Sequence, residues 1–191
     1  MRAHDGIAAG PLTAAAGLAL AAGGVVLLLM SAGCSAKHAD LSPGRFADAR
    51  GRFSIVPPAG WQIKQDPGGS GAAFLEPPQG PADDFRENIN IVVAKLPADM
   101  GLEAYAKVND DNLTKCATDY QELESATVVI NGQDARRTVF RHKVGALDLQ
   151  VLSYLLVKGG RGYGLACTAK TDAYKDHEPI FERTCRSFRA Q

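Results

Sequence analysis

The stretch ESATVVINGQDARRTVFRHKV, residues 124–144, decides the fold class. Two runs with alternating apolar and polar residues flank the dipeptide Asn131-Gly132. A two-residue type I′ turn places both of its central residues at positive φ, which asparagine and glycine adopt more readily than other residues. The stretch therefore predicts a β-hairpin, that is, two neighbouring antiparallel strands.

The segment that follows, ALDLQVLSYLLVKGGRGYGLACTAK (residues 146–170), repeats this pattern. A long strand over about 147–158 is joined through Gly159–Gly162 to a shorter strand over 163–168. Consecutive hairpins pair neighbouring strands in opposite directions. We therefore expect the second half of the chain to form an antiparallel sheet.

Upstream of these hairpins the sequence predicts further strands, bounded by proline and glycine. They cover 53–55, 61–65, 72–76 and the β-branched run INIVVAKL at 89–96. The GGSG at 68–71 has neither the Lys-Ser/Thr of a phosphate-binding loop nor the spacing of a nucleophile elbow, so we interpret it as the end of a hairpin.

Two helices complete the predicted plan. Residues at three- and four-residue spacing predict an amphipathic helix from Leu102 to Tyr120, with NDDN at 109–112 on a solvated face or at a break. The segment 172–188 predicts a helix in two pieces, with Pro179 in the first turn of the second piece. Strands, helix, strands and helix with antiparallel pairing define an α+β fold in which helices cover the sheet.

The amino-terminal segment has a different character. No charged residue occurs between Ala14 and Gly33, and the stretch LLLMSAGCSAKH at 27–38 places small residues directly before Cys34. Ser31-Ala32-Gly33-Cys34 resembles the lipobox of bacterial lipoproteins. That resemblance implies cleavage before Cys34 by signal peptidase II and a lipid on Cys34 that anchors the protein to a membrane. The predicted organisation is a signal peptide at 1–33, a flexible tether at 34–50 and a domain at 51–189.

Two alternatives for this segment stay open, an uncleaved membrane anchor and an ordinary secretory signal. Ser31 stands where the lipobox usually has Leu, Val or Ile, and the 20 residues from Ala14 to Gly33 are just long enough to span a bilayer as a helix. All three interpretations place residues 35–191 outside the cytoplasm.

The charge balance excludes one class of partner. The chain holds 21 basic and 21 acidic residues, and removal of 1–33 leaves 20 of each sign. Because nucleic-acid binding needs an excess of basic residues to neutralise phosphates, we expect no nucleic-acid partner.

Five short stretches resemble the PsbP-like and DcrB-like group of small exported proteins. They are FSIVPPAGW (53–61), NINIVV (88–93), VINGQDARRTVFR (129–141), GYGLACTA (162–169) and IFERTCRSF (180–188). The resemblance covers nearly the whole domain and implies an antiparallel sheet sandwiched between helices, an α/β/α arrangement. It also implies a function of the accessory kind, mostly non-enzymatic, and no functional residue of the photosystem branch has a match in this chain.

The cysteines are the residues whose chemistry can be predicted from the sequence. If Cys34 bears lipid, Cys116, Cys167 and Cys185 remain, which allows one disulfide and one spare thiol. We expect Cys167 to pair with Cys185 because the terminal helix should fold back over the strand before it. Cys116 stays open as the spare thiol or as the alternative partner of Cys185, since a rise of about 1.5 Å per residue can carry Cys185 past Cys167.

We expect the protein not to be an enzyme, and we predict no catalytic, cofactor or metal site. The domain holds two histidines, His142, which we expect to be an exposed strand residue, and His177. Four acidic residues are candidates for a catalytic pair, and we interpret them as solvated loop groups; they are Asp83, Asp84, Glu87 and Glu122.

The leading functional hypothesis is therefore a lipid-anchored protein of the bacterial cell envelope whose non-catalytic domain binds another envelope protein or supports an envelope assembly. One alternative is a periplasmic binder of a small apolar or lipidic ligand, which an apolar pocket open to solvent would favour. Another is a hydrolase, which would need His142 or His177 within hydrogen-bond reach of a nucleophile and a carboxylate.

Overall fold

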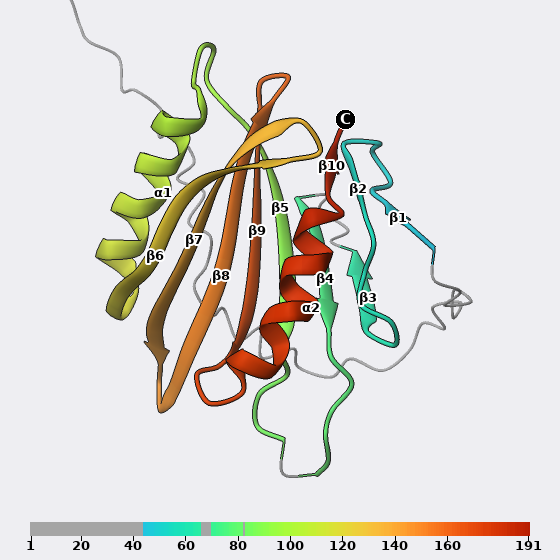
Figure 1. The fold of residues 1–191 in the computed structure, drawn as a ribbon, viewed down its shortest axis with the longest axis vertical. Helices are drawn as coiled ribbons and strands as arrows, with labels where there is room; N and C mark the ends of the chain where they lie inside the picture. Colours follow the sequence, from blue (N-terminus) through green and yellow to red (C-terminus); the bar gives the residue numbers. More distant parts are fainter. Residues whose placement is uncertain (1–43, 66–69, 82) are drawn as a thin grey trace, which may run out of the picture.

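The computed structural model describes residues 44–65, 70–81 and 83–191, which form two β-sheets and two α-helices (Figure 1). In chain order the elements are β1 (Phe46–Ala47), β2 (Phe53–Ile55), β3 (Gln62–Gln65), β4 (Gly71–Leu75), β5 (Asn88–Lys95), α1 (Leu102–Cys116), β6 (Thr118–Ile130), β7 (Gln133–Val144), β8 (Leu147–Lys158), β9 (Arg161–Lys170), α2 (Tyr174–Arg186) and β10 (Arg189–Ala190). The segment 1–33, Cys34, the first part of the predicted tether and the first two residues of the GGSG stretch lie outside the described residues.

Seven strands form one antiparallel sheet in the order β3-β4-β5-β9-β8-β7-β6. Both predicted hairpins are present. Strands β6 and β7 turn at Asn131-Gly132, where φ is 49° and 76°. Strands β8 and β9 turn at Gly159-Gly160, which also have positive φ, so this turn needs two residues rather than the four predicted.

The two helices cover opposite faces of this sheet. On β8, Tyr154 and Leu156 belong to the large apolar core that also contains Phe181 of α2. The alternate residues Val151 and Leu155 contact side chains of α1 on the other face. Successive side chains of a strand point to opposite faces, so β8, covered by a helix on each side, is buried along most of its length. The predicted antiparallel sheet covered by helices is confirmed.

A close contact between α1 and strand β9 positions the helix on the sheet. A Cβ atom added to Gly162 of β9 would lie 2.7 Å from Cζ of Tyr105 on α1, so only glycine lets the Tyr105 ring lie against the strand here. The helix ends at Cys116, and Tyr120 lies in β6 rather than on the helix. Asn109, expected on a solvated face or at a break, is buried within the continuous helix.

A second, three-stranded sheet in the order β1-β2-β10 brings the beginning and the end of the domain together. Strand β1 lies inside the predicted tether 34–50, and the buried carboxylate of Asp48 binds the Arg52 guanidinium at 2.7 Å. The folded domain therefore begins before residue 51 and reaches beyond residue 189. The short strand β1 has too few apolar residues to be recognised without its partner β2.

The prediction of a two-piece terminal helix is wrong, because α2 is continuous with Pro179 inside it. A proline at this position removes one backbone hydrogen bond to the residue four earlier, Lys175. Lys175 is exposed, so water can reach the carbonyl group that loses its partner. Tyr174 and Phe181, on either side of Pro179, are both buried in the same core, which holds the two halves in one helix. Neither helix of the described residues is long and apolar enough to cross a membrane.

Candidate functional site

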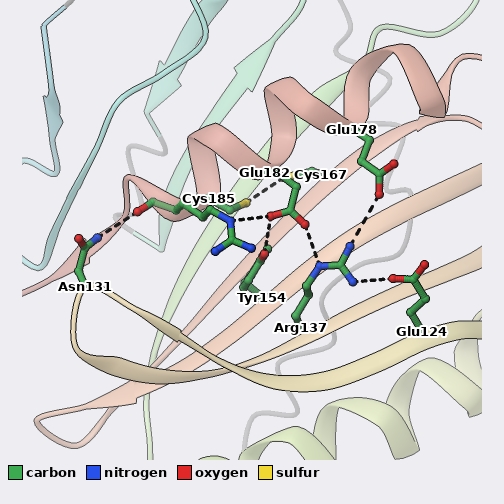
Figure 2. Close-up of polar contacts among 9 residues, drawn as sticks. Glu124, Asn131, Arg137, Tyr154, Cys167, Glu178, Glu182 and Cys185 are labelled. Carbon is green, nitrogen blue, oxygen red and sulfur yellow. Dashed lines mark hydrogen bonds and ion pairs between the residues drawn. The ribbon is translucent and has the colours of Figure 1, made fainter.

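A cluster of ionic and polar side chains joins α2 to three strands of the large sheet (Figure 2). At its centre is Arg137 of β7, whose side chain is only 14% exposed. Its Nη1 lies 2.7 Å from Oε2 of Glu124 on β6, and its Nε lies 2.8 Å from Oε1 of Glu182 on α2. Nη2 is 3.7 Å from Glu178, one helical turn away. One guanidinium thus connects strands β6 and β7 to the helix.

Glu182 is the carboxylate that this cluster satisfies most completely. The Tyr154 hydroxyl of β8 donates to its Oε2 at 2.7 Å, and Arg186 Nε donates to the same oxygen at 3.2 Å. Burial alone would raise the pKa of Glu182, but the hydrogen bonds from Tyr154 and Arg137 outweigh it and lower the pKa below its ordinary value. The carboxylate is therefore ionised at neutral pH and holds α2 to β7 and β8.

The hairpin turn also contacts the end of α2. The side-chain amide of Asn131 donates to the carbonyl oxygens of Arg186 at 3.0 Å and Phe188 at 2.7 Å. These carbonyl groups lie at the carboxyl end of the helix, where no N–H group of the helix is available to donate to them. Asn131 thus has two roles, as a turn residue at positive φ and as a cap for α2 (Figure 2).

The structure brings the two predicted disulfide partners together. Cys167 on β9 and Cys185 on α2 are fully buried, and their Sγ atoms lie 3.2 Å apart (Figure 2). Both are present as thiols, and burial raises the pKa of Cys167 well above its ordinary value. Cys116 is exposed at the end of α1, on the opposite side of the sheet from α2. A bond between Cys167 and Cys185 stays a prediction, and the geometry favours it over the alternative with Cys116.

The expectation that His142 is exposed is wrong, because its side chain is only 2% exposed. Strand alternation places His142 on the same face of β7 as Phe140, and the two rings lie 5.9 Å apart under α1. Neither ring nitrogen has a hydrogen-bond partner among the described residues. Burial lowers the pKa of His142, so the imidazole is neutral at pH 7.

A cavity of about 630 Å³ opens beside His142 at one end of the sheet. The charges around it are largely paired with one another: Lys143 lies 3.1 Å from Asp119 and 3.8 Å from Asp148, and Lys170 binds Asp84. A second cavity of about 490 Å³ lies where the β6–β7 turn meets the carboxyl end of the chain. It has a mixed lining that includes Asn131, Gln133, Lys158 and Arg189.

His177 has a defined set of partners. Its Nδ1 lies 2.9 Å from the carbonyl oxygen of Ala173, and its Nε2 lies 2.9 Å from Oε2 of Glu76. Burial disfavours the imidazolium, but the bonds to Ala173 and Glu76 outweigh burial and raise the pKa of His177. Both ring nitrogens therefore meet a carbonyl or a carboxylate, not the hydroxyl or thiol that a hydrolytic nucleophile would supply.

Among the four acidic residues singled out in the sequence, the structure brings Glu87 close to His177 and separates the others. Asp83 accepts hydrogen bonds from backbone N–H groups of its own loop, Asp84 pairs with Lys170, and Glu122 is exposed on β6. Glu76, which completes the group around His177, was missed. It follows a short strand in a proline-rich stretch and carries no signal of its own in the sequence.

Comparisons with known proteins show what the fold resembles. No protein-family model and no curated protein matches this chain. The solution structure of cyanobacterial PsbP (CyanoP) from Synechocystis sp. PCC 6803 matches with a TM-score of 0.59 at 17% identity, covering 83% of this chain and 98% of that one. LpqN of Mycobacterium tuberculosis, a protein involved in cell envelope biogenesis, matches with a TM-score of 0.62 at 12% identity, covering 76% and 88%.

The Ran-binding protein Mog1p of Saccharomyces cerevisiae matches with a TM-score of 0.53 at 12% identity, covering 79% of this chain and 96% of that one. Identities this low establish a common fold and leave activity and partners open. The chain has the PsbP-like fold that the five sequence stretches implied.

Proposed function

We propose that this protein is a lipid-anchored accessory protein of the bacterial cell envelope, whose PsbP-like domain lies outside the cytoplasm and binds a partner protein without catalysis. The lipobox-like residues before Cys34 support the anchor. The fold shared with LpqN, a protein involved in cell envelope biogenesis, supports the compartment. The fold shared with a Ran-binding protein supports the capacity of this architecture to bind other proteins.

The observation that carries the binding role is the exposed edge of β6. This strand is the last of the seven-stranded sheet, and among the described residues no strand pairs with its outer side. Its side chains are mostly exposed, including Leu123 and Val129, the latter at 62%. An edge strand presents free N–H and C=O groups, and an extended peptide can add to it as a further strand. The partner that fits this edge is an extended segment of an envelope protein.

The alternative of a small apolar ligand has less support. Large apolar side chains, among them Phe74, Phe181 and Tyr163, fill the space between the sheet and α2 and are fully buried there. The cavity beside His142 is lined mainly by charged and polar residues, and the second cavity is mixed. Sites for small ligands are predominantly apolar with few polar groups, which these linings do not resemble.

Lipid anchoring through Cys34 predicts that cells expressing the full-length chain incorporate labelled palmitate into it and retain it in the membrane fraction. The Cys34→Ala variant is expected to lose the label, because the thiol that carries the lipid is absent. Cys116→Ala is the matched control and is expected to keep it. Label that persists in Cys34→Ala would contradict the anchor, whereas persistent membrane association without label would indicate an uncleaved helix.

Strand addition at β6 predicts site-specific cross-linking in intact cells. A photo-reactive amino acid at Leu123 is expected to give a discrete adduct with one envelope protein, and the same probe at Glu103 on α1 is not. Val129→Lys in the Leu123 probe chain is expected to reduce the adduct at least fivefold, because a lysine on the edge opposes strand pairing. Equal adducts from both probe positions, or an adduct unaffected by Val129→Lys, would count against this edge as the binding surface.

A further inference from the structure

Two carboxylates and an imidazole meet at one end of the large sheet. Glu76 directly follows β4, Glu87 directly precedes β5, and His177 lies on α2. One ligand atom from each of the three lies within 4.8 Å of the others. The backbone N–H of Glu76 donates to the carbonyl oxygen of Glu87 at 2.9 Å, which holds the two glutamates side by side.

The histidine is oriented as a metal ligand would be. A carbonyl oxygen can only accept, so the contact with Ala173 places a proton on Nδ1 of His177. The other nitrogen, Nε2, then faces the carboxylates. Histidines that bind metals commonly donate their second N–H to a backbone carbonyl in this way, which fixes the tautomer and the plane of the ring.

Glu87 supplies a second, independent observation. The residue is only 7% exposed, and its carboxylate has no hydrogen bond or ion pair among the described residues. The basic side chains near it on neighbouring elements are Lys170, whose ammonium binds Asp84, and His177. A buried carboxylate without a direct partner is unfavourable, and a bound cation would remove that cost.

We propose that Glu76, Glu87 and His177 form a binding site for a divalent transition-metal ion, with Zn²⁺ as the preferred ion. Zn²⁺ binds imidazole nitrogen and carboxylate oxygen at about 2.0 to 2.2 Å, which places ligand atoms about 3 to 4 Å apart. The Nε2 to Oε2 distance of 2.9 Å already lies near that range, and the 4.8 Å spread closes with small side-chain rotations. Two carboxylates and a neutral imidazole balance the charge of the ion.

The donor set also excludes other common ions. Ca²⁺ and Mg²⁺ prefer oxygen ligands alone, whereas imidazole suits Zn²⁺ and its neighbours in the first transition row. Three protein ligands leave a coordination position for water or for a group from a partner. Since Glu76 follows β4, Glu87 precedes β5 and His177 lies on α2, the ion would connect the amino-terminal half of α2 to the ends of these two neighbouring strands, away from the Arg137 cluster.

The test is a titration of the full-length chain in mild detergent, stripped of metal with a chelator and purified with a tag that contains no histidine. The chain carries Cys116→Ser so that the exposed thiol does not bind zinc. Isothermal calorimetry with Zn²⁺ is expected to show one ion per chain. Glu87→Gln and His177→Ala are each expected to weaken binding at least tenfold, whereas the matched control Glu103→Gln, an exposed glutamate in the first turn of α1, leaves it unchanged.

Replacement of Zn²⁺ by Co²⁺ distinguishes binding at this site from binding to cysteine thiolates. The expected spectrum has visible cobalt bands without a thiolate-to-metal charge-transfer band. Absence of saturable binding by the parent chain, equal affinity in Glu87→Gln, or a thiolate band would each overturn the proposal. If His177→Ala does not fold, as judged by circular dichroism, Glu87→Gln and Glu76→Gln decide the result, because both keep the size of the side chain.

Discussion

Oxidation of Cys167 and Cys185 to a disulfide is expected to raise the free energy of unfolding by about 3 kcal/mol. The two residues are 18 positions apart in the chain, and closing a loop of that length removes about this much conformational freedom from the unfolded state. The sulfur atoms need to approach by about 1.2 Å to form the bond. Both are buried between β9 and α2, so the bond would fasten the terminal helix to the centre of the sheet.

Urea unfolding of the protein with and without reductant measures this difference. Cys185→Ala is expected to lose the response to reductant, and Cys116→Ser is expected to retain it. Mass spectrometry of non-reduced peptides identifies the bond directly. A parent protein whose stability does not respond to reductant, together with free thiols at Cys167 and Cys185, would show that the pair stays reduced in the oxidising compartment that the anchor implies.

Glu182→Ala is expected to lower the free energy of unfolding by about 2 kcal/mol, because it removes the acceptor for Tyr154 and one partner of the partly buried Arg137. Glu178→Ala is the matched control. It lies one turn away on α2, is 39% exposed compared with 22% for Glu182, and contacts Arg137 at 3.7 Å, so we expect a loss below about 0.5 kcal/mol. Chemical unfolding of the parent protein and both variants at pH 7 measures the two losses in the free energy of unfolding.

The contribution of Glu182 to the free energy of unfolding is expected to decrease at acidic pH. Its pKa is lowered in the folded protein, so its contribution is fully present above its ordinary value of 4.5. The contribution is lost as the pH falls through the lower folded-state pKa, where protonation removes the charge that Tyr154 and Arg137 stabilise. The difference between the parent protein and Glu182→Ala is therefore expected to shrink as the pH falls from about 5 through the lowered pKa of Glu182 in the folded protein. A difference that is constant over this range would show that the carboxylate charge is not what binds α2.

Local patterns predicted the antiparallel sheet because the information lies in neighbouring residues. Asn131-Gly132 and Gly159-Gly160 supply the positive φ values that a two-residue turn requires, and the alternating runs beside them have the period of a strand. The terminal helix was also visible in the spacing of Phe181, Cys185 and Phe188, all of which are buried. Its break at Pro179 was predicted wrongly, because the local cost of a proline is offset by burial of the helix on both sides of it.

Side chains whose surroundings come from distant parts of the chain were harder to predict. His142 has charged neighbours in the sequence and was expected to be exposed, yet α1 covers its face of β7. Phe46 begins a strand within a stretch that resembles a tether, because its partner β2 and the terminal β10 are needed to form the small sheet.

The sequence by itself determined the strands of the large sheet, their turns and their antiparallel pairing, since each depends on residue types at short spacing. Only the tertiary structure decided that Glu76, Glu87 and His177 meet, and that Arg137 connects Glu124 with Glu182. The physical reason is the same in both cases. A local pattern specifies which face of an element a side chain occupies. Groups from distant segments meet only where α2 crosses the sheet, and burial of the apolar face of α2 sets that crossing.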